Sequence, residues 1–181
     1  YWCLHSLKKY FEKFNLKIID AEKIDTHGGS LRVYVSKKSN RFKISKNIEQ
    51  MLKEEIKLGI FNSKLFLNFR KKIEIKKKKV IYNIKNLKKK YGKIYGFGAP
   101  AKATTLINYF GINKYVDEVL EDNKLKHNFY IPGTEIKIKS KKTIKKKINC
   151  MIVFAWNFFD SIKSKNKNLS KNIISIKEIE E

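Results

Sequence analysis

The feature that most constrains the fold is a regular alternation of short apolar runs and helical patterns from Lys93 onward. The apolar runs lie at 93–99, 115–122, 135–140, 149–156 and 172–176, and the helical patterns lie at 101–110, 141–147 and 158–165. Strands that alternate with helices are typical of a parallel sheet covered by helices. We therefore predict an α/β fold with a Rossmann-like parallel sheet flanked by helices.

A different pattern precedes this sheet. The predicted elements are a helix at 4–14, two antiparallel strands at 16–24 and 30–38, a helix at 46–58 capped by Ser45, and a long helix at 62–89. The periodicity of the long helix suits a connector between two lobes.

These elements divide the chain into three parts. We expect residues 1–60 to form part of one unit, 61–90 to be a connecting helix and 91–181 to form the Rossmann-like domain. The chain begins at Tyr1 rather than Met, and we expect the first part to belong to a larger domain.

The net charge of +25 points toward nucleic acid, but its composition does not. Only three of the 42 basic residues are arginine, the side chain that reads guanine and stacks on bases. We interpret the lysine runs as solvated faces and expect no specific nucleic-acid partner. A basic nucleic-acid-binding protein remains the weaker alternative.

Several other classes are disfavoured by the residues that the chain lacks. No apolar run reaches the roughly 18 residues of a membrane span, and no signal-peptide pattern opens the chain, so we expect a cytoplasmic protein without a membrane partner. Cys3 and Cys150 form no C-x-x-C pair, and we expect buried reduced thiols and no metal site.

Small and rigid residues are scarce in this chain, yet they gather in three short segments. Both prolines and five of the eight glycines fall within residues 27–32, 96–105 and 130–134. Such clustering indicates that the backbone requires these residues there.

The second of these segments matches G-x-G-x-x-A between a predicted strand and helix, where a helix N-terminus can receive a phosphate. Pro100 removes one of the amides that would face a pyrophosphate, and Lys102 adds a cation. Two interpretations stay open at this point: contact with a nucleotide phosphate, or a tight turn that needs glycine for packing.

Three further positions are candidates. His27 lies in a glycine-rich turn, and histidine is the residue type whose ordinary pKa suits a general base at neutral pH, although a plain surface histidine is the alternative. Asp122 opens a polar loop at the carboxyl end of a strand, where open sheets bind ligands, and an ordinary turn is the alternative. Trp156 and Asn157 lie at the end of the apolar fourth strand. They are either ligand contacts or a core tryptophan followed by a capping asparagine.

The order of the motifs resembles the sugar C-methyltransferase family, whose members depend on S-adenosylmethionine. The motifs are Tyr-aromatic-x-Leu-His-Ser-Leu at 1–7, HGGSLR at 27–32, GFGAPAKATTLINYFGI at 96–112, EDN with K-x-x-x-Y-x-PGT at 121–134, and FAWNF at 154–158. The resemblance covers nearly the whole chain. It implies that residues 1–60 end a methyltransferase domain and that 91–181 form a nucleotide-sugar-binding domain.

The resemblance also implies a reaction and its residues. A carbon of a nucleotide-linked ketosugar is methylated after loss of the proton beside the carbonyl, with His27 as the catalytic base. The implied substrate-binding residues are Gly28, Gly29, Ser30, Arg32, Gly98, Ala99, Pro100, Lys102, Thr104, Asp122, Asn123, Lys126, Tyr130, Pro132, Gly133, Thr134, Trp156 and Asn157.

The cofactors implied by the resemblance lie mostly beyond this chain. S-adenosylmethionine would bind mainly to the rest of the enzyme, and zinc to an N-terminal segment, so we expect the fragment to be inactive alone. The alternative function is an NAD(P)-type dinucleotide-binding oxidoreductase module built on the G-x-G-x-x-A turn.

Overall fold

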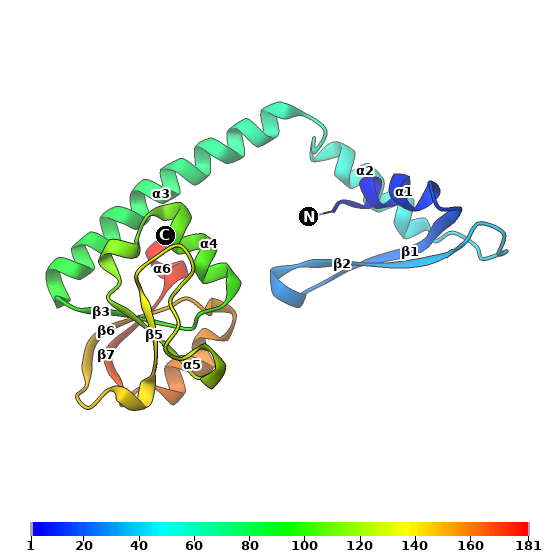
Figure 1. The fold of residues 1–181 in the computed structure, drawn as a ribbon. Coiled ribbons are helices and arrows are strands. Elements are labelled where there is room, and N and C mark those ends of the chain that lie inside the picture. Colours follow the sequence, from blue (N-terminus) through cyan, green and yellow to red (C-terminus); the bar gives the residue numbers. More distant parts are fainter. Residues whose placement is uncertain (1, 181) are drawn as a thin grey trace. The chain divides into compact units, whose positions relative to one another are not determined.

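The computed structural model describes residues 2–180, apart from the side chain of His27. The chain divides into two compact units, one running to Arg70 and the other beginning at Lys71, and each is considered by itself (Figure 1). No helix in the described part combines the length and the apolar character needed to cross a bilayer.

The first unit is an antiparallel hairpin with helices packed against it. Its elements are α1 (Leu4–Glu12), β1 (Leu16–Ile24), β2 (Ser30–Lys37), α2 (Lys46–Lys57) and the start of α3 (Ser63–Tyr91). Leu4 of α1, Ile18 and Ala21 of β1 and Ile48 of α2 form its buried core. These elements confirm the order predicted from periodicity, with helix ends that differ by one or two residues.

Two polar side chains determine how the helices of this unit begin. Ser45 caps α2 by accepting the amide of Asn47 at 3.2 Å, as predicted. Glu55 of α2 accepts the amides of Leu4 and His5 at 2.6 and 2.9 Å, which satisfies the first turn of α1. A carboxylate at a helix N-terminus also suits the helix dipole, so Glu55 joins the two helices.

The second unit contains a five-stranded sheet in which every pairing is parallel. The strands are β3 (Ile94–Phe97), β4 (Glu118–Glu121), β5 (Lys137–Ser140), β6 (Ile148–Val153) and β7 (Ser170–Ser175), in the order β5-β4-β3-β6-β7. The chain adds β4 and β5 on one side of β3 and then crosses to β6 on the other. This arrangement confirms the Rossmann-like α/β fold and places a topological switch point between β3 and β6.

Helices cover both faces of this sheet. They are the later turns of α3, α4 (Ala101–Phe110), α5 (Phe159–Lys165) and α6 (Ile176–Glu180). Residues of α3, α4 and α6 share one hydrophobic cluster with Ile152 of β6. Phe159 and Ile162 of α5 join a second cluster with Met151 and Val153. Because β6 is buried on both faces from Cys150 onward, its sequence is continuously apolar from there to Val153.

Five single-turn 3₁₀ helices connect these elements within the described residues: Thr26–Gly28, Asn113–Tyr115, Lys124–Lys126, Lys141–Thr143 and Trp156–Phe158. The Lys141–Thr143 turn stands where a helix over 141–147 was predicted. Ser140 accepts the Lys142 amide at 3.3 Å, and Ile144 then adopts an extended conformation against the second cluster. The lysines that follow provide no apolar face that could hold another helical turn.

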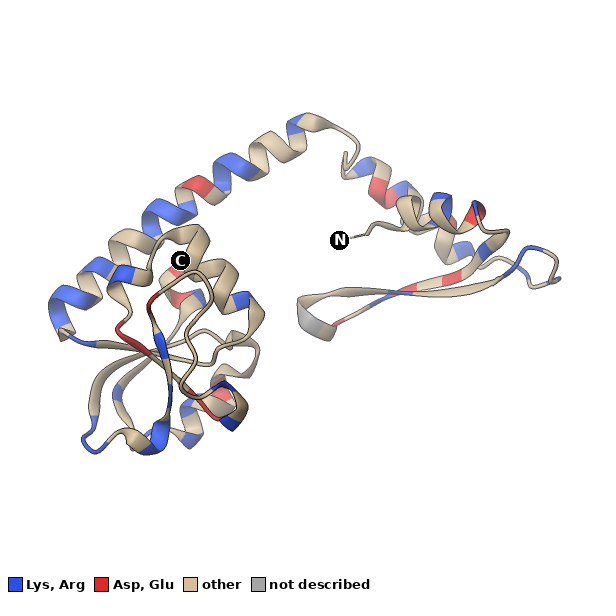
Figure 2. Cartoon of the chain, in the orientation of Figure 1, with Lys and Arg blue, Asp and Glu red and all other residues tan. Residues whose placement is uncertain are grey.

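The charged residues follow the pattern expected of a solvated surface. Figure 2 shows lysine and arginine on helices, strands and loops of both units, with acidic residues among them. Of the two cysteines, Cys150 is fully buried in β6, where burial raises the pKa of its thiol to about 11. Cys3 is half-buried and caps α1.

Candidate functional site

The turn after β3 lies against the end of β6 and depends on two glycines. A Cβ atom on Gly96 would lie 2.5 Å from Cε2 of Phe154, and one on Gly98 would lie 2.9 Å from Cβ of Ala155. Gly98 also has a φ of +87°, which favours glycine. Glycine is therefore required at both positions for packing. These close contacts bring together the segments that follow β3 and β6.

Glu121, at the end of β4, binds the turn through its whole carboxylate. Oε2 accepts the amide of Ala99 at 2.8 Å, and Oε1 accepts the amides of Asp122 and Asn123 at 2.9 and 3.0 Å. In a dinucleotide-binding fold, an acidic residue at this strand end would hold a ribose hydroxyl. Here backbone amides already occupy both oxygens.

Lys126 and His127 complete this network. The Lys126 ammonium donates to the carbonyl of Ala99 at 2.9 Å and lies 3.8 Å from Oε2 of Glu121. Nε2 of His127 lies 2.8 Å from the Glu121 carbonyl oxygen. Lys126, which the sequence predicted as a substrate contact, is thus directed at the protein's own turn.

The start of α4 leaves a small set of donors beside β6. Pro100 is the N-cap, and its carbonyl accepts the amides of Ala103 and Thr104 at 2.9 and 3.4 Å. Among the described residues, no acceptor takes the amides of Ala101 and Lys102. These amides, at the positive end of a ten-residue helix, are available to an anion.

Lys102 places an ammonium group in the same region. Its Nζ lies 5.2 Å from the centroid of the half-buried Trp156 ring, which follows β6. Among the described residues, it forms no ion pair with a carboxylate. The neighbouring Asn157 is exposed. The switch point therefore combines free amides, a cation and an aromatic ring, which together suit a phosphorylated ligand.

The predicted ligand-binding residues between β4 and β5 do not lie together, because some are at the carboxyl end of the sheet and others at the amino end. Asp122 pairs with Lys141 at 2.9 Å, and Asn123 caps the following 3₁₀ turn, both at the carboxyl end. The Pro132 carbonyl instead accepts from Asn108, in the last turn of α4, at 2.9 Å. Because α4 returns toward the amino ends of the strands, Pro132, Gly133 and Thr134 lie at the end of the sheet opposite to Lys102. The side chain of Tyr130 is exposed.

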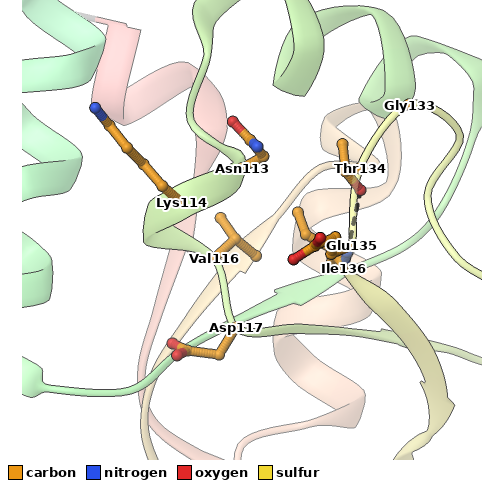
Figure 3. A pocket seen from close by; sticks show the side chains of 8 residues that line it. All are labelled: Asn113, Lys114, Val116, Asp117, Gly133, Thr134, Glu135 and Ile136. Atoms are coloured by element: carbon orange, nitrogen blue, oxygen red, sulfur yellow. Dashed lines mark hydrogen bonds between the residues drawn. The ribbon is translucent and has the colours of Figure 1, made fainter.

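A pocket of about 860 Å³ occupies that opposite end of the sheet (Figure 3). It is lined by Asn113, Lys114, Val116, Asp117, Gly133, Thr134, Glu135 and Ile136. Figure 3 shows Lys114 extending away from Glu135. The hydroxyl oxygen of Thr134 accepts a hydrogen bond from the amide of Ile136 at 3.1 Å. No motif in the sequence pointed to Asn113 or Glu135. The free amides lie elsewhere, at the switch point, which is therefore the candidate anion site.

The remaining predicted residues lie in the first unit. Thr26–Gly28 form a 3₁₀ turn between β1 and β2, and Gly28 and Gly29 have φ angles of +85° and +114°. Gly29 and Ser30 line a cavity of about 520 Å³ together with Met51 and Leu58. His27 lies in this turn, but its side chain is outside the described part of the structure.

Arg32 of β2 is engaged within its own hairpin. It binds Glu22 of β1 at 3.0 Å, and the hydroxyl of Tyr34 donates to the same Oε1 at 2.7 Å. The hydrogen bonds from Tyr34 and Arg32 hold the pKa of Glu22 below its ordinary value. Arg32, a predicted substrate contact, would have to exchange this partner to bind an anion.

No cluster of three or more His, Cys, Asp or Glu side chains that could hold a metal ion occurs in the described residues. Neither they nor the comparisons support the zinc expectation.

Comparison with known proteins adds two findings. A family described as the C-methyltransferase C-terminal domain matches residues 25–175, from the His27 turn to the end of β7. The C-methyltransferase NovU of Streptomyces niveus is 25% identical over 174 residues, which cover 95% of this chain and 41% of NovU. The chain thus spans about two fifths of the length of this curated relative.

Proposed function

The chain belongs to the family of the C-methyltransferase C-terminal domain, and on this premise we propose that it is the C-terminal portion of an S-adenosylmethionine-dependent C-methyltransferase. We propose a nucleotide-linked ketosugar as its substrate. The second unit would hold the nucleotide-sugar, and the first would supply the candidate general base. The relative NovU, a C-methyltransferase, supports the reaction class.

One observation carries the substrate proposal. The amides of Ala101 and Lys102, with no acceptor among the described residues, meet the Lys102 ammonium at the switch point of a parallel sheet. Helix N-terminal amides and a lysine are the donors with which proteins bind phosphate. A sugar carried on a nucleoside diphosphate brings its own phosphates to such a site.

The network around Glu121 argues against the oxidoreductase alternative. A dinucleotide needs a free acidic side chain at the end of the second strand for its ribose, and it needs successive amides for its pyrophosphate. Glu121 is bound by three backbone amides, and Pro100 supplies no amide. These contacts favour a nucleotide-sugar over an NAD(P)-type cofactor.

The chemistry that this chain would contribute is proton removal. A carbon acid beside a ketone needs a base whose pKa lies near the working pH, which is the ordinary range of histidine. In the proposal, His27 takes the proton from the carbon beside the sugar carbonyl, and the electron pair moves onto the carbonyl oxygen as an enolate. Gly28 and Gly29 let the backbone bend so that this residue can reach a ligand.

The described residues do not form a site for the methyl donor. When bound, S-adenosylmethionine supplies an electrophilic methyl group, but at the end of β4 Glu121 already accepts three backbone amides and Asp122 pairs with Lys141. We therefore derive no step through the donor and assign its binding to other parts of the enzyme.

Calorimetric titration of this chain tests the substrate proposal. We expect nucleotide-sugars to bind weakly and NAD to bind more weakly still, because both bring a diphosphate to the same donors, whereas Glu121 at the end of β4 is already bound by backbone amides and cannot readily hold the second ribose of NAD. Binding of NAD without binding of any nucleotide-sugar would instead support the oxidoreductase alternative.

A further inference from the structure

Trp156 is contacted by a second lysine that the motifs did not single out. The ammonium of Lys177 lies 5.1 Å from the centroid of the Trp156 ring, and that of Lys102 lies 5.2 Å from it. The three side chains come from the segments that follow β3, β6 and β7, which are neighbouring strands. Two lysines are thus held against one aromatic ring at the carboxyl edge of the sheet.

Lys177 is fixed by a carboxylate that is almost completely buried. Glu180, only 7% exposed, accepts from Lys177 at 3.1 Å and from Lys76 of α3 at 3.0 Å. A single carboxylate shared by two lysines leaves positive charge in excess, and Lys102 adds to it. An ammonium has three donors, so the Lys177 group keeps capacity for a ligand while it contacts Trp156 and Glu180.

The spacing of the Lys102 and Lys177 ammonium groups suits more than one phosphate. Since each ammonium is about 5 Å from the same ring centroid, the two are no more than about 10 Å apart. A diphosphate can therefore contact both groups, with the amides of Ala101 and Lys102 as additional donors on the same side.

The other side of the turn is closed to such a ligand. Glu121 and Lys126 occupy the amide and the carbonyl of Ala99, and their opposite charges lie 3.8 Å apart, so the β4 side presents a network that is already satisfied. An anion therefore gains more on the other side of the turn, beside the ammonium groups of Lys102 and Lys177.

We infer that Lys177, together with Lys102, binds the diphosphate group of the ligand over the β6–β7 side of the switch point. This inference rests on the proposed function, and it goes further because it adds Lys177 to the site and fixes the side on which the phosphates lie. A dinucleotide in a Rossmann fold crosses the switch point and also needs the side of the second strand, where an acidic residue holds its ribose.

The test compares charge-matched variants of the 181-residue chain. Lys177→Gln and Lys102→Gln each remove one cation of the cluster. Lys171→Gln removes one exposed cation at the amino end of β7, the opposite edge of the sheet. Isothermal titration with UDP, TDP, GDP and their sugar conjugates measures the affinity, and melting temperature shows that each variant is folded.

We expect Lys177→Gln and Lys102→Gln each to weaken binding of the diphosphates about tenfold, the worth of a hydrogen bond to a charged group, and Lys171→Gln to leave it unchanged. Lys177→Arg, which keeps the charge, should retain most of the affinity. If the wild-type chain binds the diphosphates and Lys177→Gln weakens that binding no more than Lys171→Gln does, this inference is wrong. The proposed function would be unaffected by that result. Absence of nucleotide-sugar binding by the wild-type chain contradicts the proposed function itself.

Discussion

Replacing His27 with asparagine in the complete enzyme is expected to lower the rate of methyl transfer by about 100- to 10,000-fold, the usual contribution of a general base. Affinity for the ketosugar should stay nearly the same, because the imidazole acts on the proton in the transition state more than on the bound ground state. The steady-state rate and the substrate dissociation constant, measured separately, distinguish these two effects. His5→Asn is the matched control, since His5 lies in α1 with its ring 4.6 Å from that of Phe61.

Hydrogen–deuterium exchange at the carbon beside the ketone, followed without the methyl donor, isolates the proton-transfer step. We expect exchange in the wild type and in His5→Asn, and strongly reduced exchange in His27→Asn. Undiminished exchange in the His27 variant would show that another group is the base. If His27 only stabilises the turn, the variant will instead melt at a lower temperature and bind the sugar more weakly.

The second large effect is expected at Gly96, in the central strand β3. An added Cβ would lie 2.5 Å from Cε2 of Phe154 and 2.8 Å from Cγ2 of Val119, both fully buried. Neither neighbour has space to move, so Gly96→Ala should lower the free energy of unfolding of the second unit by about 3 kcal/mol, at the upper end of overpacking costs.

Gly111→Ala is the control for this substitution. Its φ is +65°, but an added Cβ would meet nothing within 4 Å, so only backbone strain of roughly 1 kcal/mol is expected. Denaturant unfolding followed by Trp156 fluorescence, in a Trp2→Phe background, reports on the second unit alone. A loss for Gly96→Ala no larger than that for Gly111→Ala would contradict the close packing of β3 against Phe154.

Local patterns in the sequence were sufficient to predict the architecture. The apolar run around Met151 and Ile152 reflects burial on both faces of β6, and the glycines at 96 and 98 reflect contacts with the segment that follows β6. The first signal follows from the burial of one strand, and the second is visible because a close approach requires glycine, although the residue that approaches it is remote in the sequence.

The arrangement of the site could not be predicted in the same way. The satisfied carboxylate of Glu121 depends on where the turn after β3 meets the end of β4, and the pairing of Lys177 with Trp156 depends on the order of β6 and β7. The placement of Pro132 beside Asn108 likewise results from a contact 24 residues apart. The role of His27 rests on the family resemblance and stays a prediction.

The proposed function is tested most directly by locating the transferred methyl group. The complete enzyme is incubated with a donor that carries an isotopically labelled methyl group and with a nucleotide-linked ketosugar, and the product is examined by NMR. We predict one labelled methyl group on a ring carbon next to the carbonyl, and no transfer to the same nucleotide-sugar after its ketone has been reduced. Label on oxygen or nitrogen, or equal transfer to the reduced sugar, would contradict carbon methylation through an enolate.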